Sequence, residues 1–168
     1  MVEPNWAYIG LGSNLDNPVD QLKRARKAVT ALEGVREQGF SSLYRSPPMG
    51  PKNQPDYINA VMAVVTELPP LVLLESLHRI EQAHGRVRGG ERWGPRVLDL
   101  DILLYGRYCM RSAQLTLPHP GLTERPFVLY PLAEIAPLSL LIPGRGTLRE
   151  LLRRCPRQGI EQLRLDHG

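Results

Sequence analysis

Four short apolar runs, separated by segments with helical periodicity, constrain the fold of this chain most strongly. The run at residues 57–66 is rich in apolar and β-branched side chains, which is typical of a buried strand. Further along the chain, Leu73, Leu77 and Ile80 recur at the spacing of an amphipathic helix. In chain order, we expect strands at residues 6–11, 35–44, 57–66 and 97–105, and helices at residues 17–34 and 69–85.

The expected order is strand, helix, strand, strand, helix, strand, which is that of the split βαβ, or ferredoxin-like, fold. It predicts an α+β protein with an antiparallel sheet and both helices packed on one face. Residues 106–168 add a helix at 125–136 and a last helix that opens with a capping box, Thr147-Leu-Arg-Glu150. We expect these C-terminal additions to wrap the same core, so that residues 1–168 form a single domain.

Local signals mark the ends of these elements. Asn17 can cap the first helix, and Pro18 suits its first position. Gly10-Leu-Gly12 stands at the end of the first strand, but the dinucleotide fingerprint needs a third glycine where Leu15 stands. We interpret the two glycines as a tight turn at which another group approaches the backbone. Two long loops, at residues 45–55 and 86–96, are candidates for functional segments.

Composition excludes several classes of protein. No stretch approaches about 18 uncharged apolar residues, so a membrane span is not expected. The first residues lack the pattern of a secretory signal, and Cys109 and Cys155 lack metal-ligand spacing. We therefore expect a cytoplasmic protein with two free thiols. The net charge is +4, and 18 of the 21 basic residues are Arg, which favours a phosphate-rich partner, either a nucleotide or a nucleic acid.

The most informative short motif is Leu98-Asp-Leu-Asp-Ile102. Strand side chains alternate, so Asp99 and Asp101 share one face and Leu100 lies on the other. Two like charges on one face repel each other. A hard divalent cation such as Mg²⁺ would relieve that repulsion and would accept substrate phosphates as further ligands. A solvated strand face that carries two acids is the alternative.

The segment just before this motif favours the metal interpretation. It carries four arginines in eleven positions, interleaved with glycines and Trp93: Arg86, Arg88, Arg92 and Arg96. Guanidinium groups bind phosphate oxygens in bidentate fashion, and together with Mg²⁺ they stabilise the charge that develops in phosphoryl transfer. The glycines would let such a loop close over its ligand.

Other candidate residues are weaker signals. Tyr57 and Asn59 share a strand face, and an aromatic ring beside a carboxamide suits a flat heterocycle. An ordinary tyrosine and a satisfied asparagine explain the same pattern. His78 and Glu81 share a helix face. His119, between two prolines, is placed to donate a hydrogen bond to a phosphate, although a loop histidine without a role is nearly as well supported.

Together these motifs resemble the 6-hydroxymethyl-7,8-dihydropterin pyrophosphokinase family of folate biosynthesis, from about residue 6 to residue 143. The run RWGPRxLDLDI is the most specific part. The other matching motifs are Gly12-Ser-Asn-Leu15, Tyr44-Arg-Ser-Pro-Pro-Met-Gly50, Gln54-Pro-Asp-Tyr-Ile-Asn-Ala60, Leu117-Pro-His119 and Arg125-Pro-Phe127. The resemblance implies transfer of pyrophosphate from ATP to the hydroxymethyl group of the pterin, with release of AMP.

The resemblance also implies roles for individual residues. Asp99 and Asp101 would hold two Mg²⁺ ions that bridge the ATP phosphates, and Arg86 and Arg96 would act with them in catalysis. The implied ATP-binding residues are Glu81, Arg88, Arg92, Trp93, Arg96, Ile102, Thr116, His119 and Arg125. The implied pterin-binding residues are Ser46, Pro47, Met49, Tyr57, Asn59 and Phe127, with Tyr57 and Phe127 sandwiching the ring. His78, Ser46 and Met49 depart from the commonest residues of the family at their positions.

Two alternatives from other classes remain. An RNA-binding module has the same element order and a basic charge, but the chain has only two Phe and places acids on the fourth strand. A pterin-binding protein without chemistry would not need the aspartate pair. We therefore expect a monomeric enzyme that binds ATP and the pterin and has no nucleic-acid or membrane partner. Arg149, Arg153 and Arg154 are interpreted as a solvated helix face.

Overall fold

The computed structural model describes residues 4–48, 54–84 and 97–163 of the chain. Its helices are α1 (Pro18–Thr30), α2 (Pro70–Ala83), α3 (Pro126–Ile135) and α4 (Leu148–Arg154). The longer strands are β1 (Asn5–Ser13), β2 (Val35–Phe40), β3 (Tyr44–Ser46), β4 (Tyr57–Thr66) and β5 (Asp99–Tyr105). The two-residue strands are β6 (Met110–Arg111), β7 (Thr116–Leu117), β8 (Leu141–Ile142), β9 (Gly146–Thr147) and β10 (Glu161–Gln162).

The main sheet has the strand order β10-β3-β4-β1-β5, and β2 also pairs with β4. Every pairing in it is antiparallel. The strands β5, β1, β4 and β2, joined through α1 and α2, reproduce the order expected of a ferredoxin-like core. The prediction of an α+β protein with an antiparallel sheet is confirmed.

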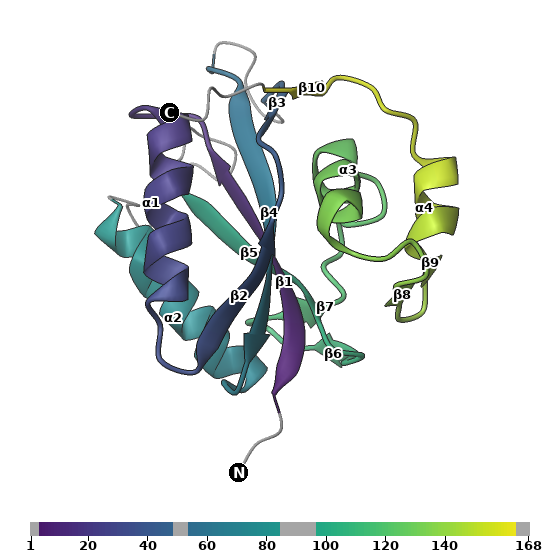
Figure 1. The fold of residues 1–168 in the computed structure, drawn as a ribbon, viewed down its shortest axis with the longest axis horizontal. Coiled ribbons are helices and arrows are strands. Elements are labelled where there is room, and N and C mark those ends of the chain that lie inside the picture. The colour runs from purple at the N-terminus through teal and green to yellow at the C-terminus, as the bar shows by residue number, and fades with distance from the viewer. Residues whose placement is uncertain (1–3, 49–53, 85–96, 164–168) are drawn as a thin grey trace.

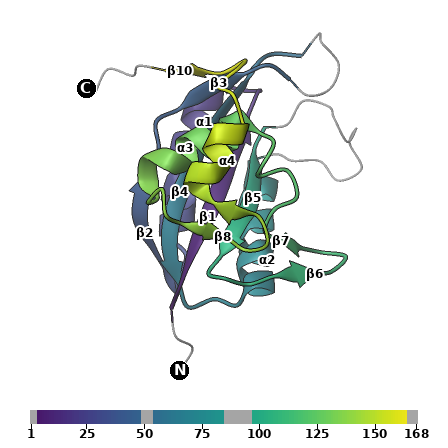
Figure 2. The same cartoon turned by 90° about the vertical axis from the view of Figure 1, so that its right-hand side faces the viewer.

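Helices cover both faces of this sheet (Figure 1). α1 and α2 lie on one face, where Leu22, Val29, Leu73 and Leu77 are fully buried against the strands. This confirms the prediction that both core helices share a face. α3 and α4 lie on the opposite face, as the turned view shows (Figure 2), and Leu129 of α3 belongs to the apolar cluster there.

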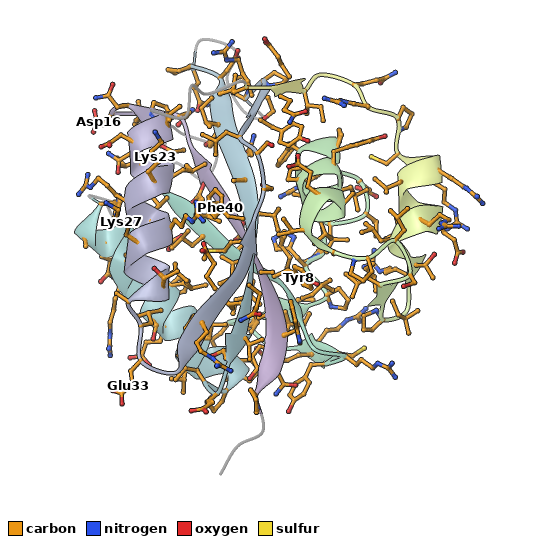
Figure 3. The ribbon with its side chains drawn as sticks, viewed as in Figure 1. Tyr8, Asp16, Lys23, Lys27, Glu33 and Phe40 are labelled. Atoms are coloured by element: carbon orange, nitrogen blue, oxygen red, sulfur yellow. The ribbon has the colours of Figure 1, made fainter. Side chains whose placement is uncertain are left out.

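Single side chains show how the sheet separates these two cores. Phe40 lies on the α1 side, where Arg26 of α1 stands 4.5 Å from its ring centroid, and Tyr8 lies on the α3 side (Figure 3). A register shift between β1 and β5 leaves Leu103 without a partner residue on β1. This bulge places both Leu103 and Leu104 on the α3 side, because an extra residue reverses the alternation of the strand.

The expected second strand, at residues 35–44, is wrong in its bounds. It is divided into β2 and β3, and residues 45 and 46, which we assigned to a loop, belong to β3. Serine chemistry explains the division. The Ser41 hydroxyl accepts a hydrogen bond from the Val61 backbone N–H at 2.9 Å and donates one to the Ser42 carbonyl at 2.8 Å, so a side chain replaces part of the ladder between the strands.

Two other local expectations are also corrected. Asn17 precedes α1 with a φ of 59° and makes no side-chain cap, although Pro18 does occupy the start of the helix. Gly10 and Gly12 lie within β1 rather than in a tight turn. The close approach holds, however, because a Cβ added at Gly12 would stand 3.4 Å from the Asn59 Oδ1.

The predicted capping box of the last helix is confirmed. Thr147 Oγ1 accepts a hydrogen bond from the Glu150 N–H, and Glu150 Oε1 accepts one from the Thr147 N–H. Cys109 and Cys155 are free thiols, as expected. Among the helices in the described part of the chain, none has both the length and the apolar character that a bilayer crossing requires.

Candidate active site

A cavity of about 150 Å³ opens where β1, β4 and β5 meet the start of α3. Its walls combine backbone, apolar side chains and a few polar groups. The residues that line it are Gly10, Leu11, Gly12, Ser46, Pro47, Tyr57, Asn59, Ala60, Val61, Asp99, Asp101, Leu103, His119, Arg125, Phe127 and Val128. A largely apolar cavity with a few convergent polar groups is the usual form of a small-molecule site.

The wall formed by β4 carries the predicted pair, Tyr57 and Asn59, and both side chains line the cavity. Asn59 is buried, and its Nδ2 donates a hydrogen bond to Ser46 Oγ at 2.7 Å. This bond fixes the plane of the carboxamide and ties β4 to the end of β3. The prediction that Tyr57 and Asn59 share one face is confirmed.

The opposite wall comes from the start of α3. Phe127 lines the cavity, and the Arg125 guanidinium carbon lies 5.8 Å from its ring centroid. A Cβ added at Gly121 would stand only 2.5 Å from Arg125 Nε. Gly121 therefore leaves the space in which the guanidinium lies beside the cavity, and any other residue there would displace it.

Asp99 and Asp101 line the same cavity from β5, and Asp101 is exposed. The register pairs them with two glycines of β1, Asp99 with Gly12 and Asp101 with Gly10. No side chain from β1 fills the space in front of the carboxylates. The prediction that the two aspartates share a face, opposite buried Leu100, is confirmed.

These carboxylates suit a hard divalent cation. Within the described ranges, no group of three or more His, Cys, Asp or Glu side chains gathers into a complete metal site. Mg²⁺ does not need one, because it commonly takes one or two carboxylates and completes its shell with water and substrate phosphates. The residues present therefore fit Mg²⁺ bound together with a phosphate ligand.

Glu81 holds the strand that carries the aspartates. Its carboxylate is buried on α2, and Oε2 accepts a hydrogen bond from the Leu100 N–H at 2.8 Å. Leu100 stands between Asp99 and Asp101 in the sequence. This hydrogen bond therefore fixes the backbone of β5 at the point where the two carboxylates leave it.

A second cavity, of about 290 Å³, lies on the other side of the aspartates. Among the predicted ATP-binding residues, Glu81, Ile102, Thr116 and His119 line it. The other lining residues are Leu74, His78, Asp99, Leu100, Asp101, Ser112, Ala113, Gln114, Leu115 and Pro120. Asp99, Asp101 and His119 thus belong to both cavities and stand at their junction.

His119 is fixed at this junction by its backbone and its ring. Its N–H donates to the Leu103 carbonyl at 2.9 Å, and its Nδ1 accepts from the Gly121 N–H at 3.0 Å. Burial lowers the pKa of His119 below 6.5, Asp101 opposes that shift and Arg125 adds to it. Because Nδ1 accepts the hydrogen bond from Gly121, it carries no proton, and the ring in this geometry is the neutral form. Since Nδ1 accepts, the single proton must be on Nε2, which is then a hydrogen-bond donor.

The structure brings most of the predicted site residues together at these two cavities. Met49, Arg86, Arg88, Arg92, Trp93 and Arg96 lie outside the described residues. Sequence reasoning missed the backbone wall at Gly10 and Gly12, although the Gly-x-Gly pattern signalled a close approach. It also missed residues 112–115, which line the second cavity from the segment between β6 and β7. No pattern in those four residues signals a site.

Comparison with known proteins adds independent information. The family model described as "7,8-dihydro-6-hydroxymethylpterin-pyrophosphokinase (HPPK)" matches residues 8–137. The 2-amino-4-hydroxy-6-hydroxymethyldihydropteridine pyrophosphokinase of Haemophilus influenzae is 50% identical over 148 residues, covering 88% of this chain and 91% of that protein. The protein of the same name from Pseudomonas aeruginosa is 48% identical over 156 residues, covering 93% and 95%.

Solved structures show the same fold at much lower identity. A structure of HPPK-DHPS in complex with substrates superposes with a TM-score of 0.73 at 13% identity, covering 96% of this chain and 47% of the other. Wild-type Plasmodium falciparum HPPK-DHPS with STZ-DHP gives a TM-score of 0.68 at 18% identity, covering 92% and 42%. This chain therefore spans less than half the length of these two solved chains.

Proposed function

Because the chain belongs to the 7,8-dihydro-6-hydroxymethylpterin-pyrophosphokinase family, we propose that it transfers pyrophosphate from ATP to 6-hydroxymethyl-7,8-dihydropterin. The hydroxymethyl oxygen attacks the β-phosphorus of ATP and forms a new P–O bond. The bond between the β-phosphorus and the oxygen that bridges it to the α-phosphorus breaks, and AMP leaves. The pterin diphosphate formed in this way is an intermediate of folate biosynthesis.

One observation carries this proposal: two cavities meet at Asp99, Asp101 and His119. A transfer between two substrates needs each of them bound on its own side of the reacting phosphate. It also needs charge stabilisation at the point where they meet. The two carboxylates, with a cation, and the donor on His119 supply that stabilisation at the junction.

The cavity bounded by β4 and α3 takes the pterin. Tyr57 and Phe127 come from opposite walls and stack on its two faces, and the fixed Asn59 carboxamide bonds its edge. Ser46 and Pro47 form the remaining side of this cavity. A neutral, planar ring binds here chiefly by stacking, because most of the wall is apolar.

The second cavity takes ATP, with the nucleoside between α2 and residues 112–116 and the phosphates at the junction. Glu81, Ile102 and Thr116 lie around the nucleoside, and Arg125 approaches the phosphates from the pterin side. The roles assigned to Met49 in the pterin site, and to Arg86, Arg88, Arg92, Trp93 and Arg96 around the phosphates, rest on the family resemblance alone.

Asp99 and Asp101 would hold two Mg²⁺ ions. Bound Mg²⁺ neutralises phosphate charge and lowers the pKa of the attacking hydroxyl. His119 donates its Nε2–H to a phosphate oxygen, and a carboxylate oxygen of Asp99 accepts the hydroxymethyl proton. Both cavities are built from one chain, which supports a monomeric, single-domain enzyme. We propose that this enzyme acts in the cytoplasm.

The test of this function is pterin-dependent consumption of ATP in the presence of Mg²⁺. We expect the wild-type protein to consume ATP when the pterin is present. In Asp99→Asn and Asp101→Asn, kcat should fall on the order of a hundredfold or more, as when a group that stabilises the transition state is removed. Asp20→Asn, an exposed change on α1, is the matched control. Near-normal turnover in both aspartate variants, or pterin binding without turnover in the wild type, would contradict the proposal.

A further inference from the structure

After α4 the chain does not leave the molecule but returns to the sheet (Figure 1). We call residues 155–163 the C-terminal strap. Its end forms β10, which pairs with β3 through Glu161 opposite Arg45 and Gln162 opposite Tyr44. The Leu163 N–H adds a further bond, at 2.8 Å, to the Leu43 carbonyl.

The strap is also tied down along its length. The Tyr130 hydroxyl of α3 donates to the Cys155 carbonyl at 2.8 Å. The Arg157 guanidinium lies 5.9 Å from the Tyr44 ring centroid and 5.8 Å from that of Tyr130. Gln162 Nε2 donates to Ser42 Oγ at 3.0 Å. Contacts with both α3 and β3 therefore define its path.

The strand that the strap covers is short. β3 has three residues and pairs with β4 on its other side. So short a strand makes few ladder bonds, and a second neighbour adds a large share of the contacts that fix its position. Glu134 of α3 holds the start of this segment, because it accepts hydrogen bonds from the Ser42 N–H and the Tyr44 hydroxyl.

The far end of β3 is the part that reaches the pterin cavity. Ser46 is its last residue, and its hydroxyl accepts the hydrogen bond that fixes Asn59. Pro47 follows and lines the same cavity. Gly159 of the strap lies beside this segment, since a Cβ added at Gly159 would stand 3.8 Å from Pro47 Cδ.

From these contacts we propose that the C-terminal strap positions the cavity wall formed by Ser46 and Pro47 and thereby sets the affinity for the pterin. Arg157 and Gln162 are the positioning residues. The inference rests on the proposed function, which assigns the pterin to this cavity. None of the described residues that line the second cavity belongs to β3 or to the strap, so the effect is confined to one substrate.

Steady-state kinetics of Arg157→Ala and Gln162→Ala test the proposal. We expect each to raise the KM for the pterin roughly two- to fivefold, the effect of one exposed cation–π contact or hydrogen bond, and to leave kcat and the KM for ATP nearly unchanged. Arg157→Lys keeps a cation at this position and should raise the KM for the pterin less than Arg157→Ala does. The matched control is Arg153→Ala, an exposed change on α4.

Amide hydrogen exchange supplies a second readout that does not depend on activity. We expect faster exchange at Tyr44–Ser46 in Arg157→Ala, with the centre of β4 unchanged. An unchanged KM for the pterin, or an equal rise in the KM for ATP, would overturn the proposal. If the wild type itself shows no pterin-dependent turnover, the proposed function fails. Exchange at β3 then decides separately whether the strap fixes this strand, and an unchanged rate there overturns the strap's role.

Discussion

The chemistry of the candidate site depends on two aspartates that stand two positions apart on one strand. Asp99 and Asp101 reach the same side of β5 because a strand alternates, and the glycines opposite them on β1 leave that side open. Glu81 then bonds the backbone between them. At the residue scale, the site consists of two carboxylates on one face of β5. Each is paired with a glycine of β1, which has no side chain to cover it.

Stacking by Tyr57 is the first prediction at this scale. Tyr57→Leu should raise the KM for the pterin roughly five- to a hundredfold, since stacking of a heterocycle on an aromatic ring contributes about 1–3 kcal/mol. Tyr57→Phe keeps the ring and should stay close to wild type. Tyr108→Leu, at a tyrosine that is 50% exposed and does not line the cavity, is the control. Equal KM values for the Leu and Phe variants would exclude stacking.

The two ring nitrogens of His119 should have different functions: Nδ1 accepts the hydrogen bond from Gly121, and Nε2 donates to the phosphate. His119→Asn reaches only to the position of Nδ1, so it keeps an acceptor for Gly121 and loses the Nε2 donor. We expect kcat to fall roughly ten- to a hundredfold, as for one lost hydrogen bond to a charged group.

His119→Gln reaches the position of Nε2 and should retain more turnover than His119→Asn. It loses the acceptor for the Gly121 N–H, so the free energy of unfolding in urea should fall by about 1 kcal/mol. Equal kcat values for the two variants would show that the Nε2–H is not used.

At the scale of elements, β1 contributes its backbone rather than its side chains to the site. Gly10 and Gly12 pair with strands on both sides, and both line the pterin cavity. The chain thus forms the floor of the cavity from a central strand. A wall of this kind is difficult to predict, because two glycines in a sequence indicate a turn more often than a strand.

Gly12→Ala tests this role of β1. The added methyl group would stand 3.4 Å from Asn59 Oδ1 and 3.8 Å from Tyr57 Cδ1, inside the cavity. We expect the KM for the pterin to rise on the order of tenfold, as when extra volume enters a packed site. Gly39→Ala is the matched control, because its methyl group would stand 3.4 Å from Ile135 Cβ and away from the cavity. An effect of equal size at Gly39 would contradict this account.

The capping box of α4 makes a prediction about stability. Thr147→Ala should lower the free energy of unfolding by about 1 kcal/mol, as for loss of an N-terminal cap. The Thr147 backbone N–H, followed by the Thr147 hydroxyl, lowers the pKa of Glu150 below 4.5. The unfolded chain binds the Glu150 proton more tightly than the folded chain does. The stabilisation of the fold by the ionised Glu150 carboxylate is therefore complete above pH 4.5, and it is lost as the pH falls through the lowered pKa of Glu150.

Urea unfolding of the wild type and Glu150→Gln between pH 7 and pH 3 checks that sign. The difference in the free energy of unfolding between the wild type and Glu150→Gln should become smaller as the pH falls. A difference that is constant or that grows in acid would contradict the capping assignment. Glu124→Gln, at an exposed residue outside α4, is the control.

At the scale of the whole molecule, sequence patterns predicted which elements pack together better than they predicted where strands end and which strands pair at the edge of the sheet. The strand and helix order, the shared face of α1 and α2, and the face shared by Asp99 and Asp101 all follow from periodicity, which depends on neighbouring residues. The division at Ser41 and the pairing of β10 with β3 do not, because they depend on partners far away in the chain. The same holds for residues 112–115, which reach the second cavity only through the fold.

The two cavities also explain why this architecture suits a transfer between two substrates. The two cavities differ in most of their lining, and among the described residues they share only Asp99 and Asp101, at the start of β5, and His119. The central claim is therefore that phosphate chemistry takes place at this junction, with the pterin on one side and the nucleotide on the other.

The most direct test of that claim is the identity of the nucleotide product formed from ATP, Mg²⁺ and 6-hydroxymethyl-7,8-dihydropterin. Phosphorus NMR and chromatography distinguish AMP from ADP and the pterin diphosphate from a monophosphate. We predict AMP and the pterin diphosphate in equal amounts, with neither product formed by Asp101→Asn at a comparable rate. Formation of ADP, or of AMP that does not depend on the pterin, would contradict pyrophosphoryl transfer at Asp99 and Asp101.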